Sequence, residues 1–338
     1  MTGTTFARRF AGRASVLAGG IALSALMAGT ALADPAIIYD LGGKFDKSFN
    51  EAGFNGATQW AKETGGHFQD LELQNDAQRE QALRRFAASD FSPIVLPGFN
   101  WASALAKISG EFPGTDFVII DDDSVNSPNV KTITFKAEDG SYLAGVLAAL
   151  KSTTGKVGFV GGMDIPLIHD FFCGYKQGVM ATNPDAEVFE NYIGTTPAAW
   201  NDPVAAGELT KADFDRGADI VYAAAGGSGL GVLQAAKDAG KLGIGVDSNQ
   251  NYLQPGSVLT SVLKRVDVAV YDAFKNADKF QGGHEVLGLA EDGVGLAMDD
   301  NNKPLITDAM TKAIDDAKAK IVAGDIKVHK YSSDSSCP

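Results

Sequence analysis

The sequence predicts an α/β protein with two similar lobes, each built around a parallel β-sheet. Short apolar runs alternate with amphipathic stretches after residue 35, which is the pattern of strands and covering helices in a parallel sheet. The alternation restarts near Gly155, so two β/α sets of similar length follow one another. No Pro-rich or Ser-rich linker separates the sets, which favours two lobes joined by short hinge strands around a cleft.

The first set consists of short apolar runs that end in glycine-rich or polar turns. Strands are predicted at residues 36–39, 67–73, 93–97, 116–120 and 130–135. The intervening segments carry apolar residues at helical spacing, as in Ala82, Leu83 and Phe86. Helices are therefore predicted at residues 51–65, 77–88, 101–111 and 142–150.

The second set repeats the pattern after Gly155. Its predicted strands are 156–160, 188–193, 220–223 and 242–246, and its predicted helices are 168–182, 203–216 and 229–239. The chain is then expected to cross back through a strand at 258–263 and a helix at 266–277, before a strand region at 286–296 and a last helix at 307–323. This assigns residues 34–152 and 251–281 to an N-terminal lobe, and residues 153–250 and 282–338 to a C-terminal lobe.

Residues 1–33 have the features of a secretory signal peptide. Three arginines at positions 8–13 precede an almost wholly apolar or small stretch at 15–29, and Ala-Leu-Ala at 31–33 is a small-x-small cleavage site. The apolar stretch is shorter than the roughly 20 residues of a membrane span. No cysteine lies at the cleavage point, so we expect cleavage near Ala33 and a periplasmic protein that is not a lipoprotein.

Composition excludes several classes of partner. The chain has 42 acidic and 29 basic residues, and without the three signal-peptide arginines the charge is 26 − 42, or −16. Nucleic acids and anionic membranes require a basic surface, so neither is expected as a partner. The four histidines are scattered, with His169 expected on a solvated helix surface, so the sequence predicts no metal site and no cofactor. We expect a monomer.

Cys173 and Cys337 are the only cysteines. An exported protein can form a disulfide. The alternative is one buried thiol and one thiol in a frayed tail, because Cys337 is next to the last residue. The sequence leaves both alternatives open.

The turn after the first predicted strand is the most informative stretch. It carries Asp40, Asp46, Ser48, Phe49 and Asn50 to the start of a helix. Open α/β sheets bind ligands at the carboxyl ends of their strands. An aromatic ring among hydrogen-bonding side chains there suggests a site that stacks on a flat, polar molecule. The alternative is that Phe49 only packs against the first helical turn.

Other polar or glycine-rich segments lie at strand–helix junctions that a cleft would bring together: 121–123, 161–168, 200–203, 226–229, 245–250 and 264–267. The segment 226–231 lacks the Lys-Ser/Thr of a phosphate loop; its N–H groups could hold a neutral oxygen, or its glycines could serve a tight turn alone. We find no Ser/His pairing or nucleophile elbow, so we do not expect an enzyme.

Four motifs occur in order along the chain. They are Asp-Lys-Ser-Phe-Asn at 46–50, Gly-Phe-Val-Gly-Gly-Met-Asp-Ile-Pro-Leu-Ile at 158–168, Gly-Val-Asp-Ser-Asn-Gln at 245–250 and Thr-Ser-Val-Leu-Lys-Arg-Val-Asp at 260–267. Together they resemble the basic membrane protein (PnrA-like) family. The resemblance implies a type I periplasmic binding-protein fold and a protein that delivers purine nucleosides to the permease of an ABC importer.

The resemblance also implies residue roles. Phe49 and Trp200 would stack on the two faces of the purine, and Phe171 would help to wall the pocket. Asp247 and Lys264 would bind the ribose hydroxyls.

Further residues complete the expected site. Asp40, Ser48 and Asp121 would read the edge of the base, although Asp122 or Asp123 could face the cleft instead. Asn50 and Gly227 are the remaining expected ligand-binding residues. The ligand would be guanosine, inosine or adenosine. A ribose-like sugar is the alternative within binding proteins, and a secreted nucleoside hydrolase, which would need clustered aspartates for a metal, is the alternative enzyme.

Overall fold

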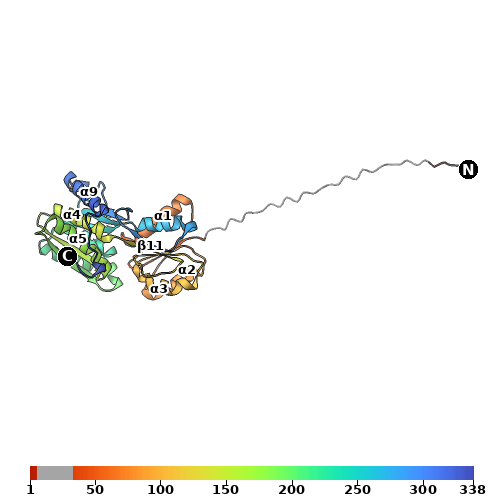
Figure 1. Ribbon diagram of the computed structural model, residues 1–338, viewed down its shortest axis with the longest axis horizontal. Coiled ribbons are helices and arrows are strands. Elements are labelled where there is room, and N and C mark those ends of the chain that lie inside the picture. Colours follow the sequence, from red (N-terminus) through yellow and green to blue (C-terminus); the bar gives the residue numbers. More distant parts are fainter. Residues whose placement is uncertain (6–32) are drawn as a thin grey trace. The chain divides into compact units, whose positions relative to one another are not determined.

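The computed structural model describes residues 1–5 and 33–338 (Figure 1). Residues 32–338 form one compact unit, and all the helices and strands discussed below belong to it. The predicted signal peptide, residues 1–33, falls almost entirely outside the described residues, and so does most of its cleavage site.

The first lobe contains a six-stranded sheet in the order β11-β5-β4-β3-β1-β2, with every neighbouring pair parallel. Its strands are β1 (Ala36–Tyr39), β2 (Gln69–Glu72), β3 (Ile94–Pro97), β4 (Phe117–Ile120), β5 (Val130–Phe135) and β11 (Gly283–Leu287). Its helices are α1 (Phe49–Thr64), α2 (Arg79–Ala87), α3 (Ala102–Ile108) and α8 (Val266–Lys275).

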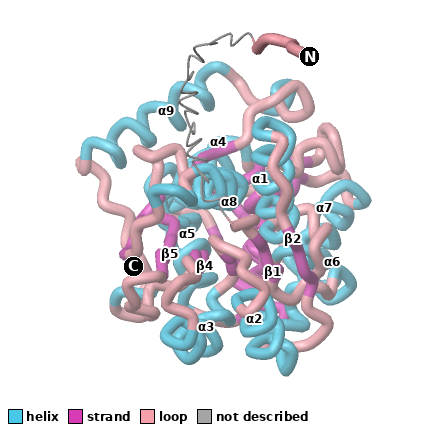
Figure 2. Tube along the Cα trace, turned by 90° about the vertical axis from the view of Figure 1, so that its right-hand side faces the viewer, coloured by secondary structure: helices cyan, strands magenta, loops and turns pink. Residues whose placement is uncertain are grey.

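Both faces of this sheet are buried, as a parallel sheet requires. Ile37 and Tyr39 point toward the core shared with α1 and α8, whereas Ala36 and Ile38 point toward α2 and α3. Figures 1 and 2 show α1 on one side of the strands and α2 and α3 on the other. The alternation of side chains along a strand explains why β1 is an uninterrupted apolar run.

The second lobe repeats this arrangement with a sheet in the order β12-β10-β9-β8-β6-β7, in which only β10 and β12 are antiparallel. Its strands are β6 (Lys156–Met163), β7 (Glu187–Gly194), β8 (Ile220–Ala224), β9 (Leu242–Asp247), β10 (Val258–Lys264) and β12 (Val294–Leu296). Its helices are α4 (Ala137–Lys151), α5 (Pro166–Thr182), α6 (Pro203–Asp215), α7 (Gly229–Asp238) and α9 (Asp308–Ala323).

Helices α4 and α5 pack closely because glycines leave their backbones room. A Cβ on Gly178 would lie 2.0 Å from the carbonyl oxygen of Tyr142, and one on Gly145 would lie 2.1 Å from that of Tyr175. Helix α4 is buried along most of its length for this reason. Among the helices of the described residues, none is both long and apolar enough to cross a membrane.

Strand pairing differs from the predicted lobe boundaries. Helix α4, predicted in the first lobe, packs on α5, and strand β10 pairs with β9 in the second sheet. Strand β11, predicted in the second lobe, pairs with β5 in the first. The chain therefore passes between the lobes three times, at residues 136, 265 and 288–293. The apolar pattern that predicts a strand does not say which of two similar sheets the strand joins.

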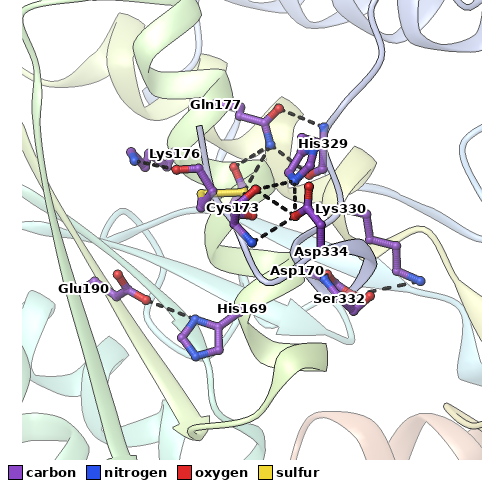
Figure 3. Close-up of a disulfide and its surroundings, with 12 residues drawn as sticks. His169, Asp170, Cys173, Lys176, Gln177, Glu190, His329, Lys330, Ser332 and Asp334 are labelled. Carbon is purple, nitrogen blue, oxygen red and sulfur yellow. Dashed lines mark hydrogen bonds and ion pairs between the residues drawn. A yellow bond between two sulfur atoms is a disulfide. The ribbon is translucent and has the colours of Figure 1, made fainter.

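The C-terminal segment is attached to α5 by a disulfide between Cys173 and Cys337, whose Cα atoms are 5.4 Å apart (Figure 3). The side chain of Gln177 hydrogen-bonds to the backbone of His329 through both its amide nitrogen and its oxygen. Asp170 accepts hydrogen bonds from the backbone N–H and hydroxyl of Ser332. The structure thus favours the disulfide over free thiols.

The same segment covers His169, which the sequence pattern placed on a solvated surface. That prediction is wrong: the ring stacks on Tyr331 with centroids 4.4 Å apart and hydrogen-bonds to Asp164 and Tyr192. The tail that covers His169 is distant in sequence, so helical periodicity could not indicate its presence.

Candidate ligand-binding site

A cavity lies between the two lobes, where the carboxyl ends of both sheets meet. The empty space within it, open mouth included, is about 610 Å³. Eight of the ten predicted site residues line it: Asp40, Phe49, Asn50, Asp121, Phe171, Trp200, Asp247 and Lys264. Ser48 and Gly227 are not among the lining residues.

Asn50 contributes an unpaired acceptor to the cavity. Its amide nitrogen donates to the carbonyl oxygens of Asp40, at 3.2 Å, and Gly43, at 3.1 Å. These bonds orient the amide, and its Oδ1 is buried with no hydrogen-bond partner. A buried acceptor without a hydrogen-bond partner costs about 1–3 kcal/mol of free energy. The site therefore favours a ligand that donates a hydrogen bond to this oxygen.

Asp46 caps helix α1 and also lines the cavity. Its carboxylate accepts hydrogen bonds from the backbone N–H groups of Ser48, Asn50 and Glu51. Burial raises the pKa of Asp46 to about 7, while the three N–H donors act in the opposite direction. Because Asp46 caps the helix, the hydroxyl of Ser48 at the N-cap position is free to bond elsewhere.

Ser48 lies behind the cavity wall and donates its hydroxyl proton to Asp247. Asp247 ends β9 with φ = 62°, a left-handed conformation that side-chain-bearing residues seldom adopt. Burial raises the pKa of Asp247 to about 6, although the Lys264 ammonium and the Ser48 hydroxyl both lower it. The expected role of Ser48 at the base edge is therefore replaced by a contact with Asp247.

Asp121 is the member of the run 121–123 that faces the cavity. Its Oδ2 pairs with the ammonium of Lys264, and both side chains are almost wholly buried. Its Oδ1 is buried without a partner, like the Oδ1 of Asn50. Asp122 instead accepts hydrogen bonds from Ser124, at the protein surface.

Asp121 and Asp247 occupy equivalent places in the two lobes. Asp121 follows β4 and Asp247 ends β9, and these strands have the same position in their sheets. Asp121 also has a positive φ, of 72°. Two such acids at matching strand ends are consistent with strain held at a functional site.

Four aromatic residues line the cavity: Phe49 and Phe99 from the first lobe, and Phe171 and Trp200 from the second. Phe49 is half-buried. The ammonium of Lys264 lies 4.8 Å from the ring centroid of Phe49 and 5.6 Å from that of Phe171. These rings and Lys264 form one cluster, with the rings able to contact a flat ligand.

Glycines make room for Trp200. A Cβ on Gly162 would lie 2.2 Å from Cζ3 of the indole, and one on Gly42 would lie 3.3 Å from the Trp200 Cβ. Gly227, which was predicted to bind ligand, instead faces the carbonyl oxygen of Trp200, from which an added Cβ would be 3.2 Å away. Its neighbour Gly226 is the glycine that lines the cavity.

The lobes are also linked beside the cavity. The hydroxyl of Ser248 donates to the carbonyl oxygen of Ser48 at 2.9 Å, and the buried amide of Gln250 donates to that of Lys47 at 3.0 Å. The Gln250 oxygen accepts from the backbone of Val246, which lines the cavity. The structure therefore holds the two walls in contact.

Several residues of the wall were not among the ten expected ligand-binding residues. They are Leu41, Asp46, Gly98, Phe99, Leu167, Ile168, Ala224, Gly226 and Val246. Gly98 and Phe99 follow strand β3, so the strand-end rule that selected Asp40 could also have selected them. Ile168 and Leu167 lie in a motif that the sequence pattern placed at a junction, without assigning a role to either.

The chemistry of the wall is that of a binding site. Cations compensate two of its four carboxylates, since Arg79 pairs with Asp40 and Lys264 pairs with Asp121. Within residues 1–5 and 33–338, no group of three or more His, Cys, Asp or Glu side chains is arranged to hold a metal ion. The wall can stack on a flat group and accept hydrogen bonds from neutral donors.

Comparisons with known proteins agree on one family. Residues 36–332 match the family described as ABC transporter substrate-binding protein PnrA-like. The chain is 35% identical over 320 residues to the CD4+ T-cell-stimulating antigen of Listeria monocytogenes serovar 1/2a, covering 87% of each chain. It is 36% identical over 241 residues to basic membrane protein D of Borreliella burgdorferi, covering 68% of this chain and 69% of the relative.

Solved structures show the same fold. The ABC transporter system solute-binding protein from Aeropyrum pernix K1 superimposes with a TM-score of 0.81 at 28% identity, covering 88% of this chain and 93% of that one. The predicted type I binding-protein fold with two parallel-sheet lobes is therefore confirmed, as is the resemblance carried by the four motifs. The chain belongs to the PnrA-like family of ABC transporter substrate-binding proteins, which bind solutes for transport and are not enzymes.

Proposed function

We propose that this protein captures a purine nucleoside between its lobes in the periplasm and delivers it, as a monomer, to the permease of an ABC importer. The main support for the proposal is that one cavity has both aromatic side chains in its wall and buried oxygen atoms that lack a hydrogen-bond donor. Phe49, Phe171 and Trp200 supply flat apolar surface, and Asn50 and Asp121 each present a buried oxygen without a donor.

A nucleoside matches both features of the wall. Its base has two π-faces, and stacking on an aromatic side chain contributes about 1–3 kcal/mol per base. Its ribose hydroxyls and the N–H groups of its base are donors for carboxylate and amide oxygens. Asp247 and Lys264, which lie at adjacent strand ends, would bind the hydroxyls, as the resemblance implies.

The charge of the cavity supports a nucleoside over a nucleotide. Asp46 and Asp247 have no cation paired to them within 4 Å in the described structure, whereas the Lys264 ammonium is already paired with Asp121. A phosphate group would therefore meet carboxylates with no free cation to compensate it. We expect inosine 5′-monophosphate to bind far more weakly than inosine.

Calorimetry on the chain from residue 34 to residue 338, freed of co-purified ligand by unfolding and refolding, tests the proposal. Inosine, guanosine, adenosine, ribose and inosine 5′-monophosphate are titrated in turn. At least one nucleoside should bind with a Kd well below tens of micromolar, and ribose should neither bind comparably nor compete. Absence of binding by every nucleoside would refute the proposal, and tight binding by ribose alone would assign the site to a sugar.

A further inference from the structure

A buried ion pair lies directly behind the cavity wall. The guanidinium of Arg79, at the start of α2, donates from Nη2 to Oδ1 of Asp40 at 2.8 Å. Arg79 is only 5% exposed, and its guanidinium carbon lies 4.7 Å from the ring centroid of Trp101. Arg79 does not line the cavity, so any effect on a ligand must pass through Asp40, which does.

Three further contacts restrain the Asp40 carboxylate. Its Oδ1 also accepts from the backbone N–H of Leu41 at 2.7 Å, and its Oδ2 accepts from the side-chain amide of Asn100 at 2.9 Å. Gly98, with φ = 109°, lies against Oδ2, because a Cβ there would be only 2.4 Å from that oxygen. The carboxylate therefore has one orientation.

The number of acceptor positions then limits what Asp40 offers to a ligand. Each carboxylate oxygen has two lone-pair sites. Oδ1 uses both, for Leu41 and Arg79, and Oδ2 uses one, for Asn100. A single acceptor site on Oδ2 remains, and Gly98 beside it is itself part of the cavity wall.

Stability alone does not explain this ion pair. Replacing a buried ion pair by apolar residues is often neutral or stabilising, and here one guanidinium nitrogen, Nη1, is buried without a partner. The guanidinium is also held by Asp76, whose Oδ1 accepts hydrogen bonds from Nε at 2.9 Å and Nη2 at 2.7 Å. The N–H that Nη2 donates to Asp40 therefore has a fixed direction, which a flexible lysine ammonium does not reproduce. The arrangement is better suited to fixing the direction of the Asp40 lone pair than to stabilising the fold.

We infer that Arg79 is a positioning residue that aims one acceptor of Asp40 at the edge of the bound base, and thereby selects 6-oxopurine nucleosides. This inference rests on the proposed function. A 6-oxopurine such as inosine presents a ring N–H, which an aimed carboxylate oxygen accepts. Adenine presents a lone pair at the same ring position, so the fixed acceptor repels it.

The test compares the Kd values of inosine and adenosine in the wild-type protein and in Arg79→Lys. The wild type should bind inosine at least about tenfold more tightly, the expected size for a hydrogen bond to a charged group. Arg79→Lys should reduce that ratio to less than about threefold. The matched control is Arg84→Lys on the same helix, because Arg84 forms a two-point ion pair with Glu111 at the surface and lies away from the cavity.

A purely structural role for Arg79 would weaken both nucleosides equally and leave the ratio unchanged, which would overturn the inference. In an Asp40→Asn background, Arg79→Lys should change the ratio no further. If Arg79→Lys does not fold, Asn100→Ala removes a half-exposed restraint on the same carboxylate and should also lower the ratio. A wild type that binds nucleosides but prefers adenosine refutes the inference alone, whereas one that binds no nucleoside refutes the proposed function.

Discussion

Gly162→Ala should weaken nucleoside binding by moving Trp200. Gly162 has an ordinary backbone conformation, so alanine is tolerated by the chain itself. The added Cβ would lie 2.2 Å from Cζ3 and 2.4 Å from Cε3 of the indole. Carbon atoms pack at about 3.5 Å or more, so the ring must retreat by about 1 Å. Losing one stacking partner costs about 1–3 kcal/mol, which weakens binding roughly 5- to 150-fold.

Calorimetry with inosine measures the loss, and intrinsic tryptophan fluorescence of the free protein reports whether the indole has moved. The matched control is Gly295→Ala in β12, because a Cβ there would meet nothing within 4 Å. The control should bind inosine as the wild type does. If the fluorescence of Gly162→Ala changes while its affinity stays within threefold of the wild type, Trp200 does not contact the ligand and the reasoning fails.

Three further predictions concern the disulfide and the charged groups of the cavity. Cys337→Ser should lower the free energy of unfolding by up to about 5 kcal/mol, because the disulfide spans 164 positions of the chain; denaturation with and without reductant measures this, and reductant should not affect the variant. Burial raises the pKa of Asp247 from 3.8 to about 6, so the folded protein favours the protonated side chain. This preference stabilises the fold fully below pH 3.8, and the stabilisation is lost as the pH rises through 6. Relative to Asp247→Asn, the free energy of unfolding of the wild type should therefore be about 1 kcal/mol higher at pH 5 than at pH 7.5. The affinity for inosine, which needs the ionised carboxylate, should instead rise from pH 5 to pH 7.5. Parallel trends in stability and affinity would contradict this prediction. Lys264→Met should lower the Tm because it leaves the buried Asp121 carboxylate unpaired, and adding Asp121→Asn should restore the Tm but not the affinity.

The strands were predictable because a parallel sheet buries both of its faces. Residues 130–135 were predicted as a strand with the bounds of β5, and 36–39 with those of β1. Helix α4 was predicted to begin at 142 rather than 137, because its first turn contains Glu138 and Asp139. Both acidic side chains are buried within the second lobe, where α4 packs mainly on α5, and the local sequence does not reveal this packing.

The site residues that lie at the carboxyl ends of strands were predictable, because open α/β sheets bind ligands there. Asp40, Asp121 and Asp247 all follow or end a strand, and all three line the cavity. Arg79 was missed because its contact with Asp40 joins residues 39 positions apart and depends on how α2 packs against the sheet. Ser48 was expected at the base edge because the family resemblance implied that role, whereas in the structure its hydroxyl donates to Asp247.

Asp121 and Asp247, the two cavity aspartates with a left-handed backbone conformation, connect the ligand-binding cavity to the contact between the lobes. The Asp121 carboxylate, in the first lobe, forms an ion pair with Lys264 from the second sheet. The Asp247 carboxylate, in the second lobe, accepts a hydrogen bond from Ser48 of the first lobe. Each of these carboxylates thus has a partner from the opposite lobe. Since a positive φ at such a residue costs on the order of 1–3 kcal/mol, contacts made across the closed cleft must offset that cost.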